Sequence, residues 1–112
     1  MVTPKFTQMP LDTAPRGTAD FVAFLQGNAN SFAKALDITF KRDRDDLDDM
    51  DIAHIRTDSG VHAFLVYYVH SPKEGVHVVI NERATNPKQE LADVLDAIGD
   101  LGNQLIWKRD DL

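Results

Sequence analysis

Four histidines are the side chains of this chain best suited to chemistry, because imidazole binds metals, transfers protons and changes charge near neutral pH. His70 and His77 flank a Pro-Lys-Glu-Gly turn between two β-rich runs, and His54 and His62 precede it. Opposed residues of antiparallel strands have Cβ atoms about 4.5–5.5 Å apart, so His70 and His77 could share an ion with Glu74. No spacing matches a metal motif, and we expect neither a metal nor a cofactor.

A run of aspartates is the second candidate for chemistry. Residues 41–51 hold three basic residues and six aspartates, so they carry −3 of the net charge of −6. A calcium loop needs glycine at its sixth position and glutamate at its twelfth, but counting from the first aspartate gives Asp and His. We expect a solvated, mobile connection, with an acidic docking loop for a basic partner or a weak cation site as alternatives. This acidic loop comprises Asp43, Asp45, Asp46, Asp48, Asp49 and Asp51.

Motifs for catalysis are missing from the chain. Cysteine is absent, which excludes thiol catalysis, disulfides and zinc–cysteine sites. There is no Gly-x-Ser-x-Gly elbow, phosphate-binding loop, dinucleotide glycine pattern or His-Glu-x-x-His sequence. The sequence therefore assigns no catalytic residue and favours a protein that is not an enzyme, with acid–base catalysis by a His–Asp pair as the alternative.

Length and charge set further limits. The chain has 112 residues, enough for one domain. Its 18 acidic and 12 basic residues provide no basic footprint for nucleic acid. No apolar run approaches the roughly 20 residues of a membrane span, and no signal-peptide core follows Met1. We expect a cytoplasmic protein that contacts neither nucleic acid nor membrane.

The elements that must position these side chains begin with an extended arm. Residues 1–17 contain three prolines, with an edge strand expected around Lys5–Met9. Residues 18–112 are expected to form a single α+β domain. Thr18 is the expected N-cap of a first helix. Its apolar residues recur at helical spacing as Phe21, Leu25, Ala29, Phe32 and Leu36.

The remaining chain predicts short strands and a second helix. The strands are expected over Asp37–Lys41, Asp51–Thr57, Val61–His70 and Val76–Arg83. The second helix begins with Asn86 as its cap and Pro87 in its first turn, and its apolar stripe extends to about Leu105. Trp107, beyond it, is expected to fill the core. The expected fold class is α+β: an antiparallel meander of three or four strands with the N- and C-terminal helices packed on one face, in the order α-β-β-β-β-α.

Turn chemistry sets the expected strand register, and a slip of one residue would exchange the two faces of a strand. Asp58–Gly60 suits a three-residue loop with glycine in the left-handed position, which pairs Thr57 with Val61. At the later turn, pairing Ser71 with Val76 leaves one face almost entirely apolar. The alternative register would mix polar and apolar residues on both faces.

All four histidines share one sheet face under these registers, with His70 opposite His77. We call it the presented face, and the helices should cover the opposite one. Its interface candidates are His54, Arg56, His62, Phe64, Val66, Tyr68, His70, His77 and Val79.

An apolar sheet face of this kind usually marks an interface. A sheet-to-sheet homodimer, a partner protein or ligand, or the arm folded back over it would each cover the face. We expect a small acidic protein-interaction module, such as an inhibitor, immunity protein, antitoxin-like factor or accessory regulator, that uses this face and the acidic loop. The alternative is a small ligand-binding or catalytic domain with a His-lined pocket on the same face.

Overall fold

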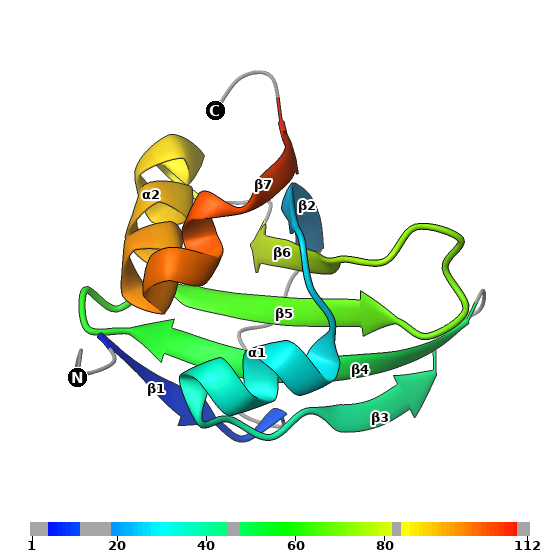
Figure 1. Cartoon of the computed structure of the whole chain (residues 1–112). Coiled ribbons are helices and arrows are strands. Elements are labelled where there is room, and N and C mark those ends of the chain that lie inside the picture. The colour runs from blue at the N-terminus through cyan, green and yellow to red at the C-terminus, as the bar shows by residue number, and fades with distance from the viewer. Residues whose placement is uncertain (1–4, 12–18, 45–47, 82–83, 110–112) are drawn as a thin grey trace.

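Seven antiparallel strands form one sheet in a computed structural model of the chain, which describes residues 5–11, 19–44, 48–81 and 84–109 (Figure 1). The helices are α1 (Ala29–Leu36) and α2 (Pro87–Ile98). Neither is long and apolar enough to cross a membrane. The strands are β1 (Phe6–Met9), β2 (Ala19–Leu25), β3 (Lys41–Arg44), β4 (Asp49–Thr57), β5 (His62–Tyr68), β6 (Val76–Asn81) and β7 (Leu105–Lys108).

The strand order is β1-β4-β5-β6-β2-β7, and β3 also pairs with β4. β1 pairs with the C-terminal half of β4, from Thr57 to His54. β3 pairs with the N-terminal half of β4, from Ile52 to Asp49, so both short strands lie along the same side of β4. At the far side of the sheet, β2 lies between β6 and β7.

The expected fold class is therefore wrong, because the sheet has seven strands and the helices are not terminal. The segment expected to begin the first helix is β2, while Thr18 lies outside the described residues. α1 begins at Ala29 with a reciprocal cap: Ser31 N–H donates to the Asn28 side chain (2.9 Å) and Asn28 N–H donates to Ser31 Oγ (3.0 Å). The error arose because Phe21 and Leu25, four residues apart, fit helical spacing, whereas in β2 they pair with Val79 and Val76 and therefore lie on opposite faces of the sheet.

The second helix is confirmed at its start and shorter than expected at its end. Asn86 caps α2 by accepting from the backbone N–H of Gln89 (3.2 Å), and Pro87 occupies the first turn. The helix ends at Ile98, a 3₁₀ turn follows over Gly99–Asn103, and β7 replaces the expected last turn. Trp107 lies in β7 and is 45% exposed, so the expectation that it fills the core is wrong.

The strands expected around the histidines are confirmed as β4, β5 and β6, and the expected edge strand is β1. The strand expected over Asp37–Lys41 is wrong, because β3 begins only at Lys41. The acidic loop is not an irregular connection in its described part, since it contributes to β3 and β4, which pair as a hairpin. Asp45 and Asp46 lie outside the described residues.

The core lies between one face of the sheet and the two helices. Phe32 and Leu36 of α1 and Leu91, Val94 and Ile98 of α2 are buried in the same cluster as residues of the central strands. The sheet residues of this cluster are Val22, Ala23, Leu25, Ala53, Ile55, Ala63, Leu65, Val76, Val78 and Ile80. Both helices thus cover the face opposite the histidines of β4 and β5.

Truncating the buried stripe of α2 should destabilise the fold. Ile98→Ala should lower the free energy of unfolding by about 2–5 kcal/mol, because Ile98 is 4% exposed within the core cluster. Lys88→Ala, on the exposed side of the same helix, should change it by less than about 0.5 kcal/mol. Chemical denaturation measures both variants. A loss below about 1 kcal/mol for Ile98→Ala would contradict its place in the core.

Candidate functional site

The register of the β4–β5 hairpin matches the sequence expectation. Thr57 N–H donates to the Val61 carbonyl (2.8 Å), and Gly60 takes the left-handed conformation with φ 96°. The ladder continues with Arg56 opposite His62 and His54 opposite Phe64. These side chains consequently lie on one face, as expected for the presented face.

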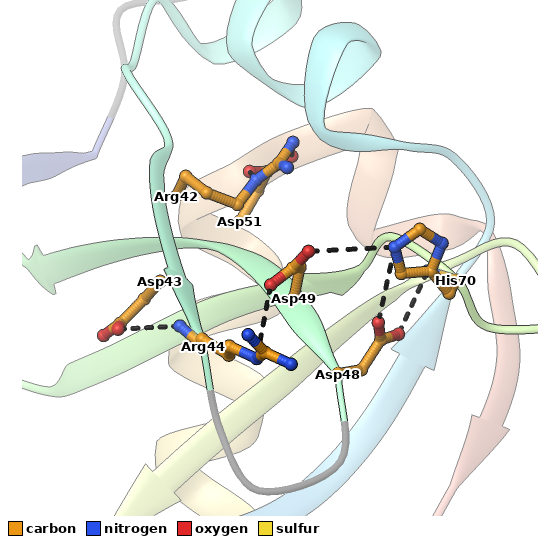
Figure 2. A network of polar contacts seen from close by, with 7 residues as sticks. All are labelled: Arg42, Asp43, Arg44, Asp48, Asp49, Asp51 and His70. Carbon is orange, nitrogen blue, oxygen red and sulfur yellow. Dashed lines mark hydrogen bonds and ion pairs between the residues drawn. The ribbon is translucent and has the colours of Figure 1, made fainter.

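The β5–β6 register is shifted by four residues from the expected one. His77 lies opposite Val66 and not opposite His70, which follows the end of β5. An even shift preserves the faces, so His77 and Val79 stay on the presented face. His70 instead contacts the hairpin of β3 and β4, which contains the described part of the acidic loop and is called the acidic hairpin below. The backbone N–H of His70 donates to Asp48 Oδ2 (3.0 Å), and His70 Nε2 lies 3.8 Å from Asp49 Oδ2 (Figure 2).

The alternative considered from the sequence, an ion shared by His70 and His77, therefore has no geometric basis. Within the described part of the chain, no group of three or more His, Asp or Glu residues could hold a metal ion. The other three histidines form two separate clusters on the presented face.

His54 and His62 form the first cluster. His54 is fully buried, and its ring stacks on Phe64 with 4.9 Å between centroids. His54 Nδ1 lies 3.2 Å from the carbonyl oxygen of Pro10, and His54 Nε2 lies 2.8 Å from His62 Nδ1. A carbonyl only accepts, so the His54 proton belongs on Nδ1, and a neutral pair requires His62 Nδ1 to donate to His54 Nε2. Pro10 thus ties the described arm to the presented face.

His62 borders a hollow of ≈ 460 Å³ at the turn end of the hairpin. Burial, followed by the neighbouring His54 and Arg56, lowers the pKa of His62 below its ordinary value. Glu90, which also lines the hollow, has its pKa raised by burial and by Asp93. The hollow therefore combines an imidazole that favours the neutral form with a carboxyl group that favours protonation more than usual.

His77 lies within the second cluster, which is aromatic. Its ring centroid lies 4.5 Å from that of Phe24, 5.1 Å from that of Phe21 and 5.6 Å from that of Tyr68. Gly75 allows this packing, because a Cβ there would overlap the Phe24 ring. Burial lowers the pKa of His77, and its Nδ1 is buried without a hydrogen-bond partner among the described residues.

The exposed apolar side chains gather at the β2–β7 end of the sheet and not at the middle of the presented face. Val66 and Val79, at the middle, are only 4% and 3% exposed. Among the described residues, the large exposed apolar side chains are Phe21 (42%), Leu105 (42%), Ile106 (38%) and Trp107 (45%), all in β2 and β7. The sequence interpretation missed this patch, although an apolar run with Ile and Trp after Gly102-Asn103 is also a strand signal.

The acidic hairpin neutralises much of its own charge. Arg42 Nε lies 2.6 Å from Asp51 Oδ1, and Arg44 Nε lies 3.8 Å from Asp49 Oδ1 (Figure 2). The described residues of this hairpin, 41–44 and 48–51, carry three basic and four acidic groups, a net charge of −1. Exposed pairs of this kind contribute little stability, about 0–1 kcal/mol each.

Comparisons with protein-family models, with curated proteins and with solved structures found no match. The function of the chain must therefore be inferred from its own geometry.

The two buried histidine clusters predict that the fold weakens on acidification. An unfolded chain binds these protons near pH 6.5, whereas the lowered pKa values of His62 and His77 delay protonation of the fold. Stability should be full above about pH 6.5 and decline as pH falls through the folded pKa values. Chemical denaturation at pH 7.5 and pH 5.5 measures the decline.

His77→Phe separates the aromatic cluster from the rest. Phenylalanine keeps the ring packing and removes both the titrating group and the unpaired buried nitrogen, so the variant should be more stable and less sensitive to pH. His62→Gln serves as the matched variant for the other cluster. Equal stability of the parent protein at both pH values would contradict the prediction.

Proposed function

We propose that the chain is a small acidic protein-interaction module whose contact surface is the sheet edge formed by β7 and Phe21. The observation that carries this proposal is the exposure of four large apolar side chains at that edge, each 38–45%. Apolar patches of this kind usually mark interaction sites. Roles as an inhibitor, immunity protein, antitoxin-like factor or accessory regulator are all compatible with a small acidic chain.

The contrast between the two sheet edges supports the proposal. At one edge, β3 has the sequence Lys-Arg-Asp-Arg with all four residues exposed. Charged side chains of this kind protect an edge strand from pairing with other chains. At the other edge, β7 has the sequence Leu-Ile-Trp-Lys, with all four residues exposed and three of them apolar. β7 therefore lacks most of this protection, as expected if another strand binds there.

The other expected contact regions have secondary roles in this proposal. Phe21 contacts Tyr68 and His77, so the β7 edge continues into the aromatic end of the presented face. The acidic hairpin would add a weak electrostatic contact for a basic partner, since most of its charge is paired internally. We also propose a cytoplasmic location without nucleic-acid contacts, supported by the absence of cysteine and the net charge of −6.

Affinity capture from the native host tests the proposed edge. Ile106→Lys places a charge within the patch and should lower the affinity for a captured partner at least tenfold, because the contact is apolar. Thr7→Lys adds the same charge to an exposed position of β1, at the opposite edge, and should bind normally. Binding constants follow from the fluorescence of Trp107, the single tryptophan. Equal affinity of both variants would contradict the proposal.

A second candidate function is the binding or conversion of a small ligand at the hollow beside His62. Its volume of ≈ 460 Å³ falls within the range usual for ligand sites. Neutral His62 would donate through Nδ1 to His54, leaving Nε2 as the nitrogen with a lone pair, as in a general base. Glu90, Ser59, Asn81 and Thr85 add polar groups to the same hollow.

Nuclear magnetic resonance tests this second candidate. Titration with small polar fragments should shift the imidazole signals of His62 and leave those of His70, which lies at the acidic hairpin, unchanged. His62→Gln should weaken binding of any such fragment at least tenfold, because it removes the basic nitrogen. No shift at millimolar fragment concentrations would count against a ligand site.

A further inference from the structure

The hollow beside His62 offers hydrogen-bond acceptors to a ligand and few donors. The backbone N–H groups of several residues that line it already donate to other groups of the chain: those of Gly60, Val61, Ala84 and Glu90. A bound anion needs N–H or O–H donors that are free to point at it. The chemistry of the hollow therefore depends on which of its side chains accept a hydrogen bond.

The hydroxyl of Ser59 can only accept from a ligand, because its proton is already used. Ser59 Oγ donates to Asp93 Oδ2 (3.2 Å). A hydroxyl has one proton, so the proton between the hydroxyls of Ser59 and Thr57 (2.7 Å) belongs to Thr57. Ser59 thus has a lone pair, and no proton, to offer in the hollow that it lines.

His62 is also an acceptor. In the neutral pair its Nδ1 donates to His54 Nε2, because His54 donates from Nδ1 to the carbonyl of Pro10. His62 Nε2 then has the lone pair, and it makes no hydrogen bond with the described residues. Burial, followed by His54 and Arg56, lowers the pKa of His62, which keeps the ring in this neutral form.

Glu90 supplies the charge of the hollow. Above its pKa, and beside neutral His62, its carboxylate is the only charged group among the described side chains that line the hollow. It forms no ion pair or side-chain hydrogen bond with the described residues. Burial and then Asp93 raise the pKa of Glu90, because both disfavour the ionised form. A cation beside Glu90 would offset both effects.

We infer that the hollow binds an organic cation whose N–H groups, those of a primary ammonium or a guanidinium, donate to Glu90, His62 Nε2 and Ser59. The inference rests on the ligand site proposed above as the second candidate function, and it names the class of ligand. The volume of ≈ 460 Å³ accommodates such a group with a short chain. Asn81 and Thr85, which can donate or accept, are available to other polar groups of the ligand.

The charges around the hollow are compatible with a bound cation. Arg56 lies opposite His62 across the hairpin, but it is exposed and does not line the hollow. Lys88, on the same helix as Glu90, is likewise exposed and outside the lining. Asp93 adds negative charge beside Glu90. The net charge of −6 also attracts cations to the protein.

Titration followed by the imidazole signals of His62 tests the class of ligand. Butylammonium should shift these signals at millimolar concentrations. Tetramethylammonium has the same charge and no N–H group, and butyrate has the opposite charge. Both should bind more weakly than butylammonium by about tenfold or more, because neither can donate an N–H to the acceptors. Tighter binding of either compound overturns the inference.

A matched pair of variants tests the role of Glu90. Glu90→Gln removes the charge and keeps the size, so it should weaken butylammonium binding by about tenfold or more. Glu74→Gln makes the same change of net charge at an exposed residue outside the hollow, and it should bind normally. Circular dichroism verifies that both variants are folded. Equal affinity of the parent chain and Glu90→Gln overturns the inference.

The pH dependence provides a further test, because binding requires ionised Glu90 and neutral His62. The pKa of His62 lies below 6.5 and that of Glu90 above 4.5, so affinity should be full at pH 7.5 and decline as pH falls below 6.5. Circular dichroism at each pH verifies that the chain remains folded. Binding that strengthens on acidification is the behaviour of an anion site and contradicts the inference.

A short peptide distinguishes two sources of the cation. Acetyl-Gly-Lys-Gly-amide has the same ammonium group on the side chain of a backbone that resembles a protein partner. Tighter binding of this peptide than of butylammonium supports a basic side chain of a partner as the ligand. Otherwise a free amine is supported.

The outcomes separate this inference from the ligand site on which it rests. If neutral polar fragments or butyrate shift the His62 signals and butylammonium does not, the class of ligand is wrong and the ligand site remains. If no compound shifts them, the inference and the second candidate function both fail. The interaction surface at β7 is independent of either result, because Ile106→Lys tests it separately.

Discussion

The pairing of β4 with β5 is the constraint on which the rest of the sheet depends. β4 binds β5 on one side and β1 and β3 on the other, so its register decides the faces of four strands. A slip of one residue would direct Arg56 into the core. The turn that prevents this slip also contacts α2: the hydroxyls of Thr57 and Ser59 are hydrogen-bonded (2.7 Å), and Ser59 donates to Asp93 (3.2 Å). One short turn thus aligns the strands and attaches the helix to them.

The features that could be predicted from sequence are those decided by neighbouring residues. The Asn86-Pro87 start of α2 and the three-residue turn ending at Gly60 each depend on local chemistry, and both are present. The faces of β5 and β6 follow from alternation, which is also local. The register between β5 and β6 does not follow from alternation, because shifts by two or four residues leave the same side chains on the same faces. The sequence therefore predicts the correct connection for His70 but the wrong partner, because β5 ends at Tyr68 and His70 contacts Asp48 instead of His77.

The features that could not be predicted depend on residues far apart in the chain. Phe21 and Leu25 have helical spacing, and only pairing with β6 and β7 makes their segment a strand. Trp107 likewise follows a helical stripe and becomes exposed because β7 pairs with β2. In the acidic hairpin Arg42 lies opposite Asp51 across the strands, a pairing that charge counting along the chain does not reveal. The surface with the strongest case for function was therefore the part least accessible to sequence interpretation.

The position of β2 between β6 and β7 has a consequence for how the chain folds. Ala19 pairs with Asn81, and Phe24 pairs with both His77 and Trp107, so β2 acquires its neighbours only after most of the chain has been synthesised. Closing such long loops before their contacts form is entropically costly and slows folding. During synthesis the apolar segment from Phe21 to Leu25 must wait without a partner strand, which leaves it prone to aggregation until β6 has been made.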